Sequence, residues 1–191
     1  MRGMGPVAAI AFLAFINPFE ASTAGRAKAY LGLYPGARLR RGSRASWNPR
    51  GRGRVRLIAR GVIMAKDAYY RPLYEAKKRY YLENPRVEGT GPGAVRWPPF
   101  KEILEDPSKC PKYEACAGRI GRGRPPCRAH LDNMARRWLA SLLVSHAAEL
   151  MKRAEGLPVD SFLAHRGYIP PKRHPEEAPE ELLERIAGGL Q

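Results

Sequence analysis

The sequence predicts an all-α fold, and three observations carry that prediction. From Ala129 to Glu155 apolar residues recur at intervals of three and four, which is the period of one face of a helix. Two shorter stretches, 54–66 and 72–82, have the same period. Glycine and proline separate these stretches and mark turns between helices. We therefore expect a bundle of helices organised around one long helix.

Two short helices are predicted at the N-terminus. The first covers Pro6 to Ile16, because proline suits the first turn of a helix. The second begins after Ser22 or Thr23 as its cap and runs to Leu31. Gly32 then ends it.

Glycines precede the first of these helices, at Gly3 and Gly5. Together with the two helices they predict a helix-hairpin-helix-like unit, whose free backbone N–H groups would hold a phosphate without reading base sequence. The alternative is that Gly3 and Gly5 only shape the entry to the helix.

An arginine-rich segment without carboxylates follows. The chain carries a net charge of +16, while residues 175–191 hold five glutamates against one arginine and so contribute −4. The predicted polyanion contacts are Arg38, Arg40, Arg41, Arg44, Arg50, Arg52, Arg54 and Arg56. Guanidinium groups pair with phosphate oxygens at any physiological pH, so nucleic acid is the expected partner.

A membrane location is not expected. The apolar run from Val7 to Ile16 is too short to span a bilayer. It also makes a poor signal peptide, because little positive charge precedes it and Pro18 and Glu20 follow closely. We therefore expect a cytoplasmic protein.

The middle of the chain combines aromatic and basic residues. The 72–82 helix is predicted to turn Leu73, Ala76 and Tyr80 inward. Its outer side would then carry aromatic and lysine side chains that either stack on bases or pack locally: Tyr74, Lys77, Lys78 and Tyr81. Residues 84–99 read as an irregular linker, anchored at its end by Trp97 and Phe100.

Three cysteines and a histidine surround a segment rich in proline and glycine. Cys110, Cys116, Cys127 and His130 form a set of ligands that a structural Zn²⁺ ion accepts. Their spacing is looser than that of common zinc modules. A disulfide and free thiols remain open alternatives.

The long helix offers a second set of candidates. His146 falls on its apolar side, where we expect a hydrogen-bonded core histidine in preference to a catalytic base. Arg136 and Arg137 point away from that side and extend the basic surface. After a proline-rich linker, Glu176 to Ile186 reads as a small amphipathic helix.

Several ordered blocks of the sequence resemble one family. They are Gly3-Met4-Gly5-Pro6-Val7-Ala8-Ala9, Asn17-Pro18-Phe19, Ala27-Lys28-Ala29-Tyr30-Leu31-Gly32-Leu33-Tyr34-Pro35 and Asn48-Pro49-Arg50-Gly51. With the paired tyrosines at 69–70 and 80–81 and the helix from His130 to Leu150, they are similar to the C-terminal domain of archaeal transposases of insertion-sequence family 110/116/902. The resemblance covers about residues 3–158.

The resemblance implies DNA recombination by a composite machine. Such enzymes pair this domain, which carries a serine nucleophile, with a RuvC-like nuclease domain that binds Mg²⁺ through four carboxylates, and a bridge RNA guides them. Before Asp67 the only acid here is Glu20, so the sequence holds no carboxylate cluster for Mg²⁺ and resembles half of such a machine. A RuvC-like nuclease chain is one expected partner; whether a nuclease domain stands upstream is left open. The nucleophile would be Ser43, with Ser46 as substitute, although Arg41 stands where the family has serine before Gly42. The alternative is that Ser43 is a solvated loop residue.

These observations divide the chain and give a predicted function. Residues 1–158 form the transposase-like domain, made of 1–66, 67–128 and 129–158, and residues 159–191 form the linker and acidic tail. We expect the DNA-binding part of a recombinase that is inactive alone, binds DNA and a guide RNA and self-associates. The alternative is a domesticated or decayed DNA- or RNA-binding protein without catalysis. Its composition is weakly typical of a thermophile.

Overall fold

The protein is mainly helical, as predicted. The computed structural model describes residues 1–16, 23–34, 44–88, 94–114 and 126–157, with the single residues 37, 42 and 92. Its helices are α1 (Pro6–Phe15), α2 (Ala24–Tyr30), α3 (Pro49–Met64), α4 (Tyr70–Glu83), α5 (Phe100–Glu105), the 3₁₀ turn η2 (Pro107–Lys109) and α7 (Pro126–Ala154). Strands β1 (Arg86–Glu88) and β2 (Val95–Trp97) form an antiparallel pair. The predicted tail helix at 176–186 lies outside the described residues.

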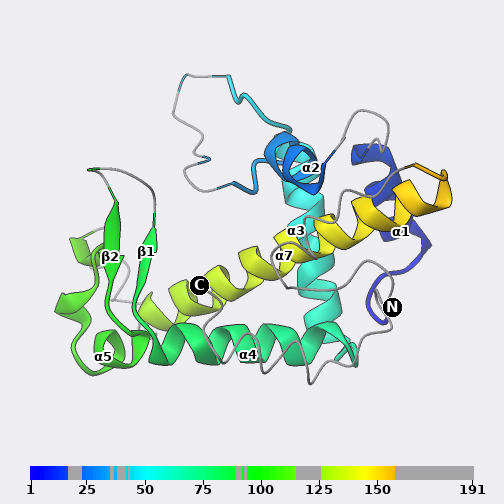
Figure 1. Cartoon of the computed structure of the whole chain (residues 1–191). Helices are drawn as coiled ribbons and strands as arrows, with labels where there is room; N and C mark the ends of the chain where they lie inside the picture. The colour runs from blue at the N-terminus through cyan, green and yellow to red at the C-terminus, as the bar shows by residue number, and fades with distance from the viewer. Residues whose placement is uncertain are drawn as a thin grey trace.

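Helices α3, α4 and α7 form the centre of the molecule. In Figure 1, α7 crosses α3 and α4 lies along its first half, with α1 and α2 at one end and the β-hairpin and α5 at the other. None of the helices in the described ranges is long and apolar enough to cross a membrane.

Local signals explain where α3 begins. Its predicted start at Arg54 was wrong, because the helix begins five residues earlier, at Pro49. The Asn48 side chain caps it by accepting a 2.9 Å hydrogen bond from the Gly51 N–H, and proline at the next position is already in a helical conformation. Thr23 caps α2 in the same way, as predicted.

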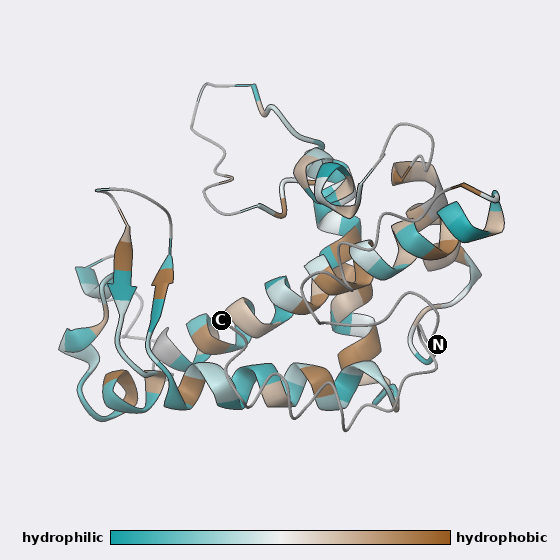
Figure 2. Cartoon of the chain, viewed as in Figure 1, coloured by the Kyte–Doolittle hydropathy of each residue, from teal (hydrophilic) through white to brown (hydrophobic). Residues whose placement is uncertain are grey.

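The main core is built on α7. Leu139, Ala140 and Val144 on this helix are fully buried, together with Leu73 of α4 and Val62 of α3. Figure 2 shows that α1, which also contributes to this core, is apolar along most of its length, while α4 alternates hydrophilic and hydrophobic bands. Because buried residues occur along most of α7, this helix has the central place that the sequence predicted.

Two tyrosines of α4 belong to the core. Tyr74, predicted to lie near the outer side, is only 3% exposed, because its hydroxyl donates to the Asp132 carboxylate on α7 and the ring can be buried without leaving a polar atom unpaired. Tyr70 is buried too, and its hydroxyl lies 2.9 Å from Nδ1 of His146. His146 is therefore a hydrogen-bonded core histidine, as predicted.

A second cluster lies at the other end of α7. It contains Trp97, Phe100, Ile103, Cys110, Leu131 and Met134. The prediction of an irregular linker over 84–99 was wrong in part, because Arg86 pairs with Trp97 and Glu88 with Val95 in a short hairpin that buries the Trp97 ring. The predicted anchor is confirmed, since Trp97 and Phe100 stack with ring centroids 5.7 Å apart.

Asp67 fastens the N-terminus to the turn between α3 and α4. One of its carboxylate oxygens accepts hydrogen bonds from the N–H groups of Tyr69 (3.1 Å) and Tyr70 (3.0 Å), at the start of α4. The other accepts a 2.8 Å bond from the backbone N–H of Arg2. The carboxylate is buried and holds three backbone donors from two distant segments.

Gly3 and Gly61 allow α1 to approach α3 closely. Gly3 has a φ of +81°, and a Cβ on Gly61 would lie 2.8 Å from the Gly3 carbonyl oxygen. Gly3 therefore has a packing role, whereas its predicted phosphate contact, like the helix-hairpin-helix unit, stays a prediction. Gly5 is the N-cap residue of α1.

Candidate nucleic-acid interface

A recess with a volume of about 420 Å³ lies between α3 and the first half of α7. Among the described residues, its lining contains four arginines and no carboxylate. The lining residues are Gly53, Arg56, Leu57, Arg60, His130, Asn133, Arg136 and Arg137. We call this recess the arginine groove.

Helical spacing places the arginines of both helices at the groove. On α3, Val55, Ile58 and Val62 pack into the core, while Arg56 and Arg60 are four residues apart on another face and are exposed. On α7, Asn133 and Arg137 are likewise four apart, so they lie on one side of that helix. The two basic faces therefore border the same recess.

The cations of this region act on one another. Although Arg56 is exposed, partial desolvation of its guanidinium lowers its pKa, and the charge of Arg137 on the other helix lowers it further. Burial also lowers the pKa of Arg52, followed by the charges of Arg56 and Arg137. Because an arginine pKa starts above 12, Arg52 and Arg56 stay charged at neutral pH despite this lowering. A bound anion would relieve their mutual repulsion.

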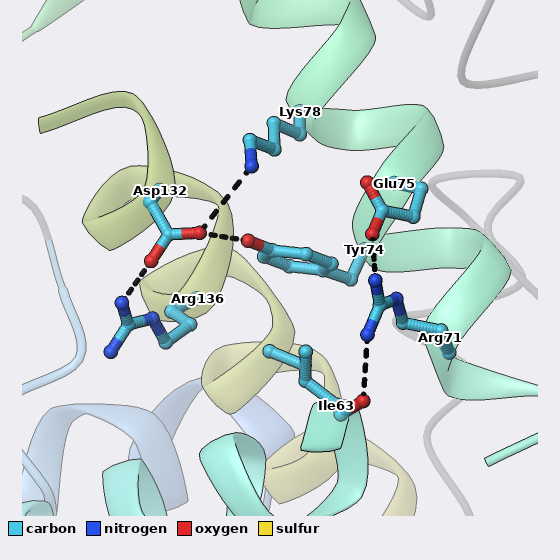
Figure 3. A network of polar contacts seen from close by, with 7 residues as sticks. All are labelled: Ile63, Arg71, Tyr74, Glu75, Lys78, Asp132 and Arg136. Carbon is cyan, nitrogen blue, oxygen red and sulfur yellow. Dashed lines mark hydrogen bonds and ion pairs between the residues drawn. The ribbon is translucent and has the colours of Figure 1, made fainter. Parts of the chain in front are cut away.

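The carboxylate of Asp132, on α7, lies next to the groove, because it pairs with the lining residue Arg136. Figure 3 shows it between α4 and α7, where it accepts from the Tyr74 hydroxyl, pairs with Arg136 and lies 3.6 Å from the Lys78 ammonium. Burial alone would raise the pKa of Asp132, but these hydrogen bonds and charges outweigh burial and hold the pKa below its usual value. Burial and the hydrogen bond to Asp132 in turn raise the pKa of Tyr74.

Asp132 therefore fixes Arg136 and neutralises part of the charge beside the groove. A neighbouring ion pair in Figure 3 does not change the charge of the groove, because neither of its residues lines the groove. In this pair Arg71 lies 2.6 Å from Glu75, and Arg71 also donates a 2.9 Å hydrogen bond to the Ile63 carbonyl. Among the lining residues, Arg56, Arg60 and Arg137 form no ion pair with any carboxylate in the described part of the chain.

Apart from Arg52, the predicted arginine contacts fall into three groups. Arg38, Arg40 and Arg41, with Ser43, lie outside the described residues. Arg44, Ser46, Arg50 and Arg54 are exposed but do not line the groove, whereas Arg56 does.

Arg52 has a structural role in addition. Its guanidinium lies 4.5 Å from the centroid of the Trp47 ring and donates a 3.2 Å hydrogen bond to the carbonyl of Ala37. This residue therefore ties the arginine-rich segment to α3.

Sequence reasoning did not find the groove itself. Arg60 ends the arginine run that predicted a phosphate-contacting surface but was not among the eight arginines named as contacts, and Arg136 and Arg137 were predicted only to extend the basic surface. The available signal was the spacing of four between Arg56 and Arg60. Their partner helix could not be identified from that spacing, because α3 and α7 are separated by more than 60 residues.

The predicted zinc ligands are only partly described. Cys110 is buried in the second cluster, and His130 lines the groove with its ring edge-on to Trp97, 6.3 Å between centroids. Cys116 and the Cys127 side chain lie outside the described residues. Within the described ranges no three His, Cys, Asp or Glu side chains gather as metal ligands, and the zinc site stays a prediction.

The side chain of Lys77 on α4 lies among three aromatic rings. Its ammonium lies 4.2 Å from the ring centroid of Tyr80, 5.0 Å from that of Tyr81 and 5.7 Å from that of Trp138. The rings pack against the two clusters, which favours the packing interpretation over base stacking. Burial, with a smaller effect from Arg86, lowers the pKa of Lys77 to about 8.

This shift has a measurable effect on stability. The pKa of Lys77 is about 8 in the folded chain and about 10.4 for an unperturbed lysine, so the unfolded state binds more protons between these values and the free energy of unfolding rises with pH there. In Lys77→Met this contribution is absent. Urea titrations of both proteins at intervals from about pH 7 to 10 measure the free energy of unfolding. The value for the wild type minus that for the variant should increase as pH rises. A constant difference would contradict the assignment, and taking the difference cancels the titration of the tyrosines.

Comparison with known protein families, with curated proteins and with solved structures finds no match to this chain.

Proposed function

We propose that this chain binds nucleic acid through the arginine groove, as the DNA-binding part of an insertion-sequence recombinase. The observation that supports binding is the convergence of Arg56, Arg60, Arg136 and Arg137 from two helices on one recess, to whose lining the described part of the chain contributes no carboxylate. Arginine forks pair with phosphate oxygens whatever the base sequence, so the proposed contact is to the backbone. The recombinase context is supported by the sequence resemblance.

The proposed role of the residues in this sequence is binding, with the strand chemistry left to a nuclease domain that carries Mg²⁺ and that these residues do not include. Serine attack on a phosphate requires an activated nucleophile and a stabilised leaving group, in addition to neutralised phosphate charge. The groove arginines can supply only the last of these, and Ser46 does not line the groove. This observation equally favours the second candidate, a nucleic-acid-binding protein that cleaves nothing. A guide RNA and self-association remain part of the first proposal.

The test removes three of the groove charges. In Arg56→Ala/Arg60→Ala/Arg137→Ala, affinity for a labelled DNA duplex should fall about 100-fold at low salt, because about three phosphate contacts are lost. The slope of log K against log[salt] should become shallower by about 0.9 for each arginine that contacts a phosphate. Fluorescence anisotropy at several salt concentrations measures both quantities, and a parallel series with single-stranded RNA compares the two nucleic acids.

A matched control removes the same charge elsewhere. Arg26, Arg79 and Arg96 are exposed on α2, α4 and β2, and none of them lines the groove. Their triple alanine variant should keep most of the wild-type affinity and slope. Equal losses in the two triple variants would show that net charge, and not the groove, determines binding; absence of binding by the wild-type chain at low salt would end the proposal.

A further inference from the structure

Helix α3 contains three glycines, and packing explains only two of them. A Cβ on Gly51 would lie 2.5 Å from the Leu31 side chain and 3.3 Å from the Phe15 ring, and a Cβ on Gly61 would meet the Gly3 backbone. A Cβ on Gly53 would have no atom of the described residues within 4 Å, and the φ of Gly53 is not in the left-handed region. Since glycine destabilises a helix interior relative to alanine, the fold gains nothing from glycine at this position.

Gly53 lies in the lining of the arginine groove, one turn before Leu57 and close in sequence to Arg56. A residue without a side chain lets a ligand approach the helix backbone closely. The cations around it determine the sign of that ligand's charge. The unexplained glycine therefore points to an anion seated against α3.

The size and charge of the groove indicate which anion. Its volume of about 420 Å³ is that of a small-molecule site, so it takes in one phosphate with its attached group, whereas a duplex would contact it only along its backbone. Asp132 offsets one of the four arginines, which leaves about three positive charges for the ligand. An internal phosphodiester brings one negative charge, whereas a terminal phosphate brings about −1.5 to −2 at neutral pH and three acceptor oxygens.

The remaining lining suits what is attached to such a phosphate. The side chain of Leu57 is 59% exposed, and Asn133 is exposed on the other helix. Leucine offers apolar surface to a sugar or base, and the asparagine amide offers both a donor and an acceptor.

We propose that the arginine groove binds a terminal phosphate, a phosphomonoester on a strand end or on a free nucleotide, and that Gly53 provides the clearance for it. This inference rests on the proposed function and narrows its ligand. Arg56, Arg60 and Arg137 hold the phosphate oxygens, and Asp132 positions Arg136 beside them.

The experiment compares oligonucleotides that differ only in their 5′ end. A short labelled single strand with a 5′-phosphate should bind the full chain about tenfold more tightly than the same strand with a 5′-hydroxyl, as one additional charge-assisted contact provides. Gly53→Ala should reduce this preference about threefold, and Gly53→Glu, which places a carboxylate in the groove, should abolish it. Gly25→Ala in α2, where the added methyl meets only Thr23 at 3.5 Å, is the matched control and should keep the preference.

Competition by adenosine monophosphate and by inorganic phosphate distinguishes the sources of the ligand. Displacement of the 5′-phosphorylated strand by the nucleotide supports a free nucleotide as ligand, and displacement only by another phosphorylated strand supports a strand end. Equal affinity for the two 5′ ends would overturn this inference while leaving nucleic-acid binding intact. A preference for the 5′-phosphorylated strand that persists in Gly53→Glu would likewise overturn this inference while leaving nucleic-acid binding intact. Failure to bind either strand would instead overturn the proposed function.

Discussion

Replacing Asp67 by alanine should lower the free energy of unfolding by about 3 kcal/mol, because three backbone N–H groups lose their acceptor at a largely buried carboxylate. These donors belong to Arg2, Tyr69 and Tyr70. The start of α4 and the attachment of the N-terminus both depend on them. For a chain of this length the melting temperature should fall by about 10 °C, which differential scanning calorimetry measures.

Two further variants separate the causes. Asp67→Asn keeps an oxygen for the α4 donors and should recover about half of the loss. Asp106→Ala removes a similar capping carboxylate, which accepts from the N–H and hydroxyl of Ser108, but at an exposed position. Its effect should be clearly smaller, because water replaces the lost acceptor. An equal loss in both alanine variants would show that burial of Asp67 is unimportant.

Replacing Gly61 by alanine should destabilise the protein by about 2 kcal/mol, since the added methyl would overlap a backbone oxygen that cannot rotate away. The oxygen belongs to Gly3, 2.8 Å from the position of the new Cβ. Relief of the overlap requires α1 to move away from α3. Urea unfolding gives the change in free energy, and limited proteolysis reports whether the first 16 residues become accessible.

The control lies in the same helix. Gly53→Ala meets no atom within 4 Å and should stabilise the fold by about 0.5–1 kcal/mol, because alanine loses less backbone entropy on folding. The two substitutions are chemically identical and eight residues apart. Stabilisation by both would contradict the close contact between α1 and α3.

Much of the helical framework could be predicted from the sequence, because helix period and capping are local. The long apolar repeat gave α7, and Thr23 gave the start of α2. The start of α3 was missed although its signals, Asn48 and Pro49, are local. The other errors came from tertiary context. Tyr74 is polar at its tip and was expected near the surface, but Asp132, 58 positions away, satisfies its hydroxyl in the interior. Strands β1 and β2 are three residues each, too short to show a period of two.

For the candidate site, the sequence predicted which type of residue would contact the ligand better than it predicted which of these residues form one surface. A run of arginines without acids is visible in one dimension and indicates a polyanion. Which of them converge is not visible, because Arg56 and Arg137 meet only through the crossing of α3 and α7. The packing around Gly51, Gly53 and Gly61 likewise had to be seen before one of these glycines could be assigned to a ligand.

The position of the arginine groove along α7 has a consequence for cooperativity. Leu131 and Met134 belong to the second cluster and Ala135 and Leu139 to the first, so the groove residues of α7 lie where the two clusters meet. The α3 wall belongs to the first cluster alone. A ligand held between the two helices would therefore couple the opening of the hairpin end to that of the main core, and the two clusters would unfold as a single unit when the groove is occupied.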